Sequence, residues 1–258
     1  MEDLDLKKIY NNPFNIQNIE NPTEEVQLAA VKKNGLTLKF INNPSKEVRK
    51  EAVKSNPLAI EFIENPSENL GILAVQSLWN SLKLIKDPTN KIIEEAIKTK
   101  GWAIQFIENP SEKMKLLAVK KDYDAIKYIK ETSEEVSLEA IKTYWGAIRY
   151  IHNASLNVKR AAVIENEEAI NYIESYDLDE LKILIGDNIN VVKYVYDSID
   201  VDLVIDVLRD KLINEDIDSE YMTNFFKLEI LEMDKINFIR EQGSKKAKML
   251  LVDYKLSM

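Results

Sequence analysis

Proline recurs every 22 residues along the first half of the chain, and this period constrains the fold more than any other feature of the sequence. The positions are Pro22, Pro44, Pro66, Pro88 and Pro110, and the register continues through Thr132 and Ala154. A fixed period between about 20 and 50 residues is typical of stacked supersecondary units, none of which buries its apolar face alone. The chain is therefore predicted to be a tandem-repeat protein.

Each repeat carries a helix start signal just after the proline position, which is counted here as zero. Position +1 is always a hydroxyl residue: Thr23, Ser45, Ser67, Thr89, Ser111, Ser133 and Ser155. Serine and threonine are favoured N-caps because their side-chain oxygen accepts a hydrogen bond from an unpaired amide. Apolar residues follow at +4, +8 and +9, on one helical face, and +8 is alanine in all seven repeats. A first helix of about ten residues is predicted, ending near +11 before glycine or proline at +13 and +14.

A second, shorter helix of about seven residues is predicted to complete the repeat. It carries mostly alanine at +15, Ile or Leu at +16, an aromatic residue at +18 in most repeats and isoleucine at +19 throughout. The residue before each proline is mostly Asn, closes the loop between repeats and is expected to be non-helical. Both helices are too short to be stable alone, so the repeats must stack. Position +7 alternates between Ala or Leu and Glu, which adds a 44-residue period and predicts that odd and even first helices pack differently.

The expected fold is all-α, an α-solenoid of about eight to nine helix-turn-helix repeats with a diverged helical cap. The repeats cover residues 1–197, with 1–21 as an N-terminal cap repeat and 176–197 as a degraded one. The register fails from residue 198, and 198–258 is interpreted as a diverged helical C-terminal region.

The repeat motif resembles known short helical repeats. Residues 42–68, NNPSKEVRKEAVKSNPLAIEFIENPSE, resemble the leucine-rich-repeat-variant and HEAT-like class in their Asn-Pro turn, Val-Arg pair and Ala-Val step. The run from Ala30 to Gly35 is also similar to an uncharacterised bacterial and viral repeat family built around Ala-Val-Lys-x-Asn-Gly. This resemblance implies an α-solenoid without a known activity, so it transfers no functional residue.

Composition and charge narrow the classes of function. The chain is 45% apolar, which is enough for a buried core, yet it has no apolar run long enough to span a membrane and no signal-peptide pattern at its start. A cytoplasmic location is expected, and zero cysteines fit a reducing compartment. The net charge of -9 is concentrated in residues 176–220, which hold 13 acidic and 4 basic residues. The lack of a basic stripe argues against nucleic-acid or membrane binding and leaves a basic protein partner open.

Residues suited to catalysis are scarce. The single histidine, His152, occupies +20, where other repeats carry Glu or Lys, so it is predicted to face solvent. One histidine cannot form a two-histidine metal site, and the six glycines form no phosphate-binding loop. The protein is therefore expected to be no enzyme and to hold no metal or cofactor. The lysines at +10 are interpreted as last-turn charges that complement the helix dipole, with a cationic strip as the alternative: Lys32, Lys54, Lys98, Lys120 and Lys142.

Two surface features are the candidate protein-binding residues. The first is a group of aromatic residues at the corner between the two helices: Trp79, Trp102, Tyr123, Tyr144 and Trp145. They are interpreted either as exposed interface anchors or as rings folded over the start of the second helix of their own repeat. The second is an acidic series, interpreted as a docking surface, a divalent-cation site or a solvated helix face: Asp200, Asp202, Asp206 and Asp210.

The function expected from these features is a non-enzymatic protein-protein interaction scaffold. An alternative is a phage or mobile-element inhibitor, which uses an acidic surface to block a nucleic-acid-handling enzyme of host defence. A second alternative is a nucleic-acid-binding HEAT-like protein, which the near-neutral repeats disfavour.

Overall fold

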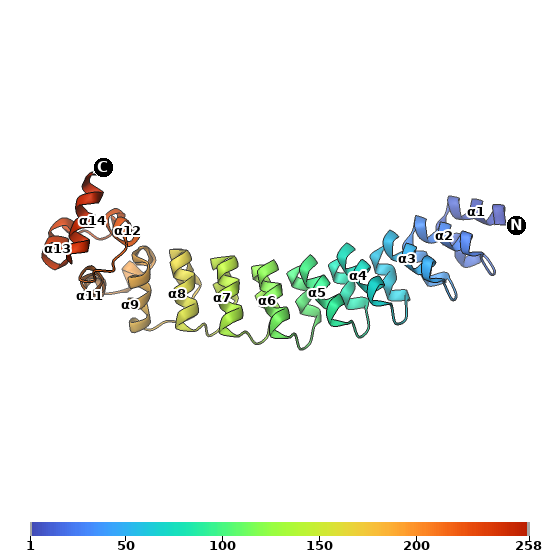
Figure 1. The fold of residues 1–258 in the computed structure, drawn as a ribbon, viewed down its shortest axis with the longest axis horizontal. Coiled ribbons are helices and arrows are strands. Elements are labelled where there is room, and N and C mark those ends of the chain that lie inside the picture. Colours follow the sequence, from blue (N-terminus) through green and yellow to red (C-terminus); the bar gives the residue numbers. More distant parts are fainter. Residues whose placement is uncertain (1, 257–258) are drawn as a thin grey trace. The chain divides into compact units, whose positions relative to one another are not determined.

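The computed structural model describes residues 2–256, and every regular element in that range is a helix (Figure 1). The chain divides into two compact bodies. The N-terminal body extends to Lys130, and the C-terminal body begins at Glu131.

The N-terminal body alternates α-helices with 3₁₀ helices. Its elements are α1 (Glu2–Asn11), η1 (Pro13–Asn18), α2 (Glu24–Lys33), η2 (Gly35–Phe40), α3 (Lys46–Ser55), η3 (Pro57–Phe62), α4 (Glu68–Ser77), η4 (Trp79–Leu84), α5 (Asn90–Thr99), η5 (Gly101–Phe106), α6 (Glu112–Lys121) and η6 (Tyr123–Tyr128).

The C-terminal body continues the alternation and then departs from it. Its elements are α7 (Glu134–Thr143), η7 (Trp145–Tyr150), α8 (Leu156–Glu165), η8 (Glu167–Tyr172), α9 (Leu178–Asp187), η9 (Ile189–Val191), α10 (Val192–Val195), η10 (Tyr196–Ser198), α11 (Val201–Leu212), α12 (Ser219–Lys227), α13 (Lys235–Gln242) and α14 (Lys245–Leu256). The predicted α-solenoid class is confirmed, because consecutive repeats stack on one another in each body.

The predicted first helices are confirmed at both ends. From α2 to α8, the hydroxyl residue at +1 is the N-cap, and each helix has ten residues and ends at +11. The cap oxygen accepts from the amide three residues on in six of these helices; the exception is Ser67 of α4. Local hydrogen bonding therefore sets where each α-helix begins.

One local expectation is corrected by the structure, and another is refined. The second helix of each repeat is a 3₁₀ helix of six residues from η1 to η8, a form that is used in short pieces because its hydrogen-bond geometry is poorer. The residues before four of the prolines lie outside the helices, as expected, and adopt a left-handed conformation with φ between 48° and 50°: Asn21, Asn43, Asn65 and Asp87. Asn and Asp tolerate this region better than other residues with a side chain, so the tight turn prevails over the pre-proline preference.

The core lies between the layer of α-helices and the layer of 3₁₀ helices. The α-helices lie side by side in chain order from α1 to α6 and from α7 to α9 (Figure 1). Every alanine at +8 between Ala30 and Ala162 is fully buried, and the residues at +9 and +16 are at most 3% exposed. Small side chains at +8 let neighbouring helices approach, so each repeat is stabilised mainly by its neighbours.

The predicted two-repeat alternation is confirmed in the N-terminal body. α2 packs more extensively on α3, and α4 on α5, than α3 packs on α4. At position +5, α4 has Gly71, where an added Cβ would lie 2.5 Å from Cδ1 of Ile92 in α5. α3 carries Arg49 at the same position, and Lys50 follows it. Both basic side chains line a space between α3 and α4.

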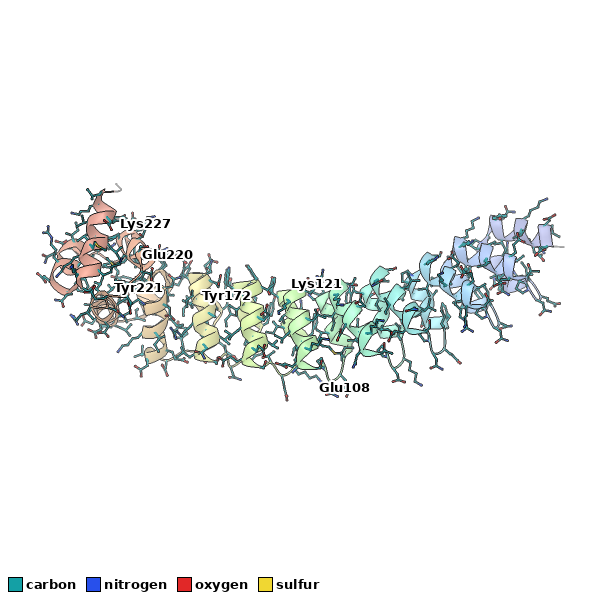
Figure 2. All side chains as sticks on the ribbon, viewed as in Figure 1. Glu108, Lys121, Tyr172, Glu220, Tyr221 and Lys227 are labelled. Carbon is teal, nitrogen blue, oxygen red and sulfur yellow. The ribbon has the colours of Figure 1, made fainter. Side chains whose placement is uncertain are left out.

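Among the last helices of the C-terminal body, α11 packs on α9 and α12 on η9, while α13 and α14 pack on α11 and α12. Tyr221 of α12 is 4% exposed, and its hydroxyl donates to the carbonyl of Ile185 in α9 over 3.3 Å (Figure 2). Glu215 accepts hydrogen bonds from the amides of Lys245 and Lys246 at the start of α14. None of the described helices combines the length and apolar content that crossing a bilayer demands.

Candidate protein-binding surfaces

Each corner tryptophan is the first or second residue of a 3₁₀ helix. Each one contacts the aromatic side chain at position +18 of the next repeat. In the N-terminal body, Trp79 stacks on Phe106 with ring centroids 5.8 Å apart, and Trp102 meets Tyr128 edge-on at 6.0 Å. These rings and that of Tyr123 are half-buried. Contact with the following repeat differs from both sequence interpretations, which placed the rings in solvent or over their own repeat.

Polar contacts fix the indole of Trp102 in this stack. Its Nε1 donates to Oδ1 of Asp124 over 2.6 Å, and Asp124 also pairs with Lys127 at 3.2 Å. The ammonium groups of Lys100 and Lys127 lie 4.7 and 4.2 Å from the indole centroid, within cation–π range. The Trp102 side chain is therefore engaged by its own body.

The C-terminal body exposes three tyrosines at or beside the corner between the helices and at position +18. Tyr144, Tyr172 and Tyr194 are 39%, 41% and 40% exposed. Trp145 contacts the first two, with ring centroids 5.3 and 6.1 Å away. Figure 2 labels Tyr172. Cζ of Arg149 lies 4.3 Å from the centroid of Tyr172. These five residues are called the tyrosine face below.

Sequence reasoning found Tyr144 and Trp145 but missed Tyr172 and Tyr194, because +18 was interpreted as a core position. One feature of the sequence could have indicated that Tyr172 and Tyr194 are exposed. Position +18 is Phe in several early repeats and becomes Tyr in the last four, from Tyr128 to Tyr194. A phenol at a repeated half-buried position indicates that one end of the ring reaches water.

Carboxylates border one end of the tyrosine face. Burial, followed by the negative charges of Glu168 and Glu167, raises the pKa of Tyr194. Tyr194 therefore stays a neutral phenol at physiological pH and keeps its hydroxyl proton. Lys193 pairs with Glu167 at 3.4 Å, so part of this charge is balanced within the body.

The acidic series lies on and beside α11, and all four side chains are exposed. Asp200 is the N-cap and accepts from the amide of Asp202 over 3.0 Å, while Asp206 pairs with Arg209 at 2.9 Å. Asp202, Asp206 and Asp210 are four residues apart and share one helix stripe. Within residues 2–256, no group of three His, Cys, Asp or Glu side chains is arranged to hold a metal ion.

The two bodies differ in charge. Residues 1–130 hold 20 basic and 18 acidic residues, whereas residues 131–258 hold 15 basic and 26 acidic residues. The tyrosine face and the acidic series therefore both belong to the body that carries the negative charge.

His152 and the +10 lysines lie as their simpler interpretations predicted. The His152 side chain is 83% exposed, with Nδ1 3.6 Å from Oε2 of Glu174. Lys54 pairs with Glu51 at 2.6 Å and Lys98 with Glu95 at 2.7 Å. Glutamates at +7 thus neutralise two of the lysines that a cationic strip would use.

One family model matches part of the chain. It is described as a domain of unknown function, DUF4116, and it matches residues 23–66. These 44 residues span two repeats, which equals the period of the helix-packing alternation. No curated protein and no solved structure matches the chain significantly.

Proposed function

We propose that this protein is a non-enzymatic scaffold that binds another protein through the tyrosine face. The observation that carries the proposal is the exposure of Tyr144, Tyr172 and Tyr194, each about two-fifths exposed. Trp145 contacts the first two of these rings, and Arg149 lies over Tyr172. Trp, Tyr and Arg supply most binding hot spots in protein interfaces. Repeat stacks are suited to this role because they hold such side chains on one extended surface.

The tyrosine face is ordered before any partner binds. Trp145 contacts both Tyr144 and Tyr172, and the Arg149 guanidinium lies over Tyr172 while its Nε donates to the carbonyl of Gly146 over 3.1 Å. Side chains held by such contacts lose little rotamer freedom on association, which lowers the entropic cost of binding.

The charge of the C-terminal body favours a partner with a basic segment. This body has 26 acidic and 15 basic residues, and Glu167 and Glu168 lie beside Tyr194. Opposite charge across an interface speeds encounter and fixes register. An aromatic anchor with an acidic border therefore fits a partner that presents Lys or Arg around an apolar contact.

The test is a double variant, Tyr172→Ala with Tyr194→Ala, compared with Tyr10→Ala in α1, where the ring is 60% exposed. A partner captured from the native host lysate is purified, and its Kd is measured for each variant after circular dichroism has shown intact helicity. The double variant is expected to raise Kd at least tenfold, and Tyr10→Ala is expected to leave it unchanged. Unchanged affinity in the folded double variant would exclude the tyrosine face as the contact.

A second candidate function is supported by the exposed acidic series. An inhibitor encoded by a phage or mobile element would place these carboxylates in the basic nucleic-acid channel of a host defence enzyme. Its test is a paired variant, Asp202→Asn with Asp210→Asn, with Asp3→Asn in α1 as the control. Inhibition by such a mechanism weakens steeply with added salt, and the paired variant lowers both the association rate and the salt dependence. Binding that does not change with salt concentration would exclude the acidic series as the contact and leave the tyrosine face as the proposed binding surface.

A further inference from the structure

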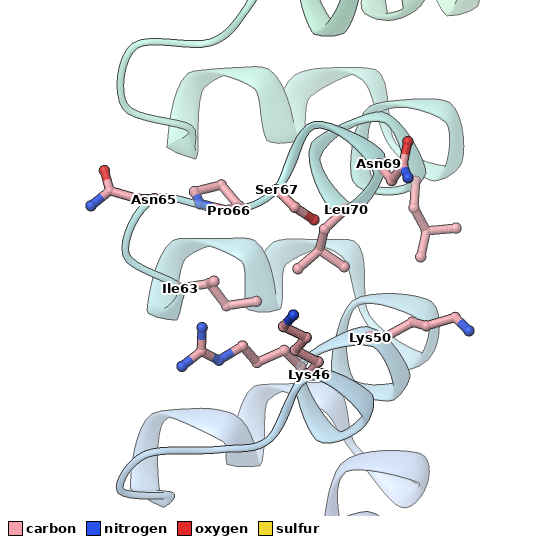
Figure 3. Close-up of a pocket in the computed structure, with 10 residues that line it drawn as sticks. Lys46, Lys50, Ile63, Asn65, Pro66, Ser67, Asn69 and Leu70 are labelled. Atoms are coloured by element: carbon pink, nitrogen blue, oxygen red, sulfur yellow. The ribbon is translucent and has the colours of Figure 1, made fainter.

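A cavity of about 460 Å³ opens between α3 and α4 in the N-terminal body (Figure 3). Three basic side chains of α3 line it, namely Lys46, Arg49 and Lys50, and no acidic residue does. Its apolar lining includes Ile63 and Leu70, and Figure 3 shows the Lys46 side chain pointing toward Leu70. A cavity of this size that joins apolar walls with a few convergent polar groups is typical of a small-ligand site.

The cavity lies at one of the looser junctions of the two-repeat alternation in helix packing. α4 is drawn to α5 by the close contact between Gly71 and Ile92, while α3 packs less extensively on α4. The basic residues at +5 and +6 of α3 line the space that results.

The positive charge in the cavity is poorly balanced by the protein. Within residues 2–256, Lys46 makes no hydrogen bond or ion pair. Arg49 is half-buried and donates from Nε to the carbonyl of Pro44 over 3.0 Å. Lys50 reaches Glu47 only at 3.9 Å. A negatively charged group entering the cavity would therefore meet three cations and one distant carboxylate.

Three other junctions between repeats of the N-terminal body contain a carboxylate that the α3–α4 junction lacks. At each of them, the acidic residue at +2 accepts a hydrogen bond from the hydroxyl at +1 of the next repeat. The pairs are Glu2 with Thr23 at 2.5 Å, Glu24 with Ser45, and Glu68 with Thr89 at 2.9 Å. The α3–α4 junction has Lys46 at +2 instead of a glutamate, and the Ser67 hydroxyl makes no cap hydrogen bond.

We infer that this cavity binds a ligand that carries a carboxylate on an apolar stem. The carboxylate takes the position that a repeat glutamate holds at three other junctions of this body. There it accepts from Ser67 and is paired by Lys46 and Arg49. Charge-assisted bonds of this kind are the strong ones, and Arg suits a carboxylate because its donors form a planar fork. The apolar stem lies on Ile63 and Leu70. The ligand is either a free organic acid or an acidic side chain of a peptide.

The test uses sodium hexanoate as the probe and hexanamide as its uncharged analogue. Amide chemical shifts of the ¹⁵N-labelled full chain are followed by NMR during titration. Hexanoate is expected to shift the amides of Ser67, Asn69 and Leu70, with an affinity at least tenfold above that of hexanamide. Chemical-shift changes of equal size with hexanoate and hexanamide would overturn the inference. So would the absence of shift changes with both hexanoate and the peptide described below.

The decisive variant is Lys46→Glu, which restores the repeat carboxylate opposite Ser67. It is expected to abolish the hexanoate shifts while keeping the fold, because the internal glutamate occupies the anion position. Lys7→Glu in α1 makes the same charge change outside the cavity and is expected to bind as the wild type. Retained binding in Lys46→Glu would contradict the site.

A blocked tripeptide, acetyl-Leu-Glu-Leu-amide, distinguishes the two sources of the carboxylate. Tighter binding of the peptide than of hexanoate assigns the cavity to an acidic side chain of a protein, and the reverse order assigns it to a free acid. This result is independent of the tyrosine face, because the variants of Tyr172 and Tyr194 leave the N-terminal body unaltered.

Discussion

Gly35 of η2 lies directly against the carbonyl oxygen of Ala52 in α3, so closely that an added Cβ would be 2.2 Å from that oxygen. Gly101 of η5 has the same relationship to Ala118 of α6, with a distance of 2.4 Å. Both glycines occur at +13, and neither has a positive φ. Their role is therefore close approach between repeats rather than a left-handed helix end, although the sequence presents them as helix breakers.

Gly35→Ala is expected to lower the free energy of unfolding by about 1–3 kcal/mol, the range typical of overpacking. The clash is with backbone, which cannot rotate away as a side chain does. Gly186→Ala is the control, because its Cβ would meet only Cγ1 of Val207 at 3.8 Å and alanine is the better helix former. Urea unfolding measures both, and equal stability of the two variants would contradict the packing role of Gly35.

Trp102→Ala is expected to destabilise the N-terminal body by about 2 kcal/mol, since the ring is half-buried and lies against Tyr128. Trp102→Phe keeps a ring but removes the hydrogen bond to Asp124, and an intermediate loss is expected. Urea unfolding and hydrogen exchange of the η5 and η6 amides measure these effects. If Trp102→Phe were as unstable as Trp102→Ala, the ring contact would carry no stability of its own.

Glu95 is expected to make the N-terminal body sensitive to acid. Hydrogen bonds from Lys98 and then Gln76 lower the pKa of Glu95 below its ordinary value of 4.5. Its ionised form therefore stabilises the fold above pH 4.5, and that stabilisation is lost as the pH falls through the lowered pKa. The effect is small because exposed ion pairs contribute little.

The measurement is the urea midpoint of the wild type and Glu95→Gln from neutral pH to pH 3. The wild type is expected to be the more stable at neutral pH, and the difference is expected to vanish in acid. Glu61→Gln, at an exposed position, is the control and is expected to match the wild type throughout. A difference for Glu95→Gln that persists at pH 3 would show that charge is not its cause.

Tyr221 is expected to make the C-terminal body sensitive to alkali. Burial, reinforced by the charges of Asp218 and Asp187, raises the pKa of Tyr221. The unfolded chain loses the phenol proton near pH 10 while the folded chain keeps it, so the unfolding free energy falls as the pH rises above about 10. Tyr221→Phe is expected to cost about 1 kcal/mol at neutral pH and to show a weaker alkaline loss.

Unfolding of the wild type, Tyr221→Phe and Tyr10→Phe between pH 8 and pH 11.5 tests this expectation. Tyr10 is 60% exposed, so Tyr10→Phe should follow the wild type. Identical pH dependence in the wild type and Tyr221→Phe would mean that other groups cause the alkaline loss.

Position-by-position periodicity was enough to predict the repeat boundaries, the hydroxyl caps from Thr23 to Ser155, the alanine core and the alternation in helix packing. Of the residues that form the tyrosine face, it singled out Tyr144 and Trp145 but not Tyr172, Tyr194 or Arg149. It also took the second helix as an ordinary one, because hydrophobic spacing over six residues does not distinguish 3₁₀ from α geometry.

The sequence by itself determined where each repeat starts and ends, because caps and helical faces depend on residues a few positions apart and recur every 22 residues. Only the tertiary structure decided which side chains meet between repeats, as Trp145 meets Tyr172 and as Lys46 stands opposite Ser67. Those pairs are 21 to 27 residues apart, and their contact depends on how closely successive helices pack. That spacing is set by side-chain volume on both partners, at Gly71 and Ile92 for example, which no single position in the repeat reveals.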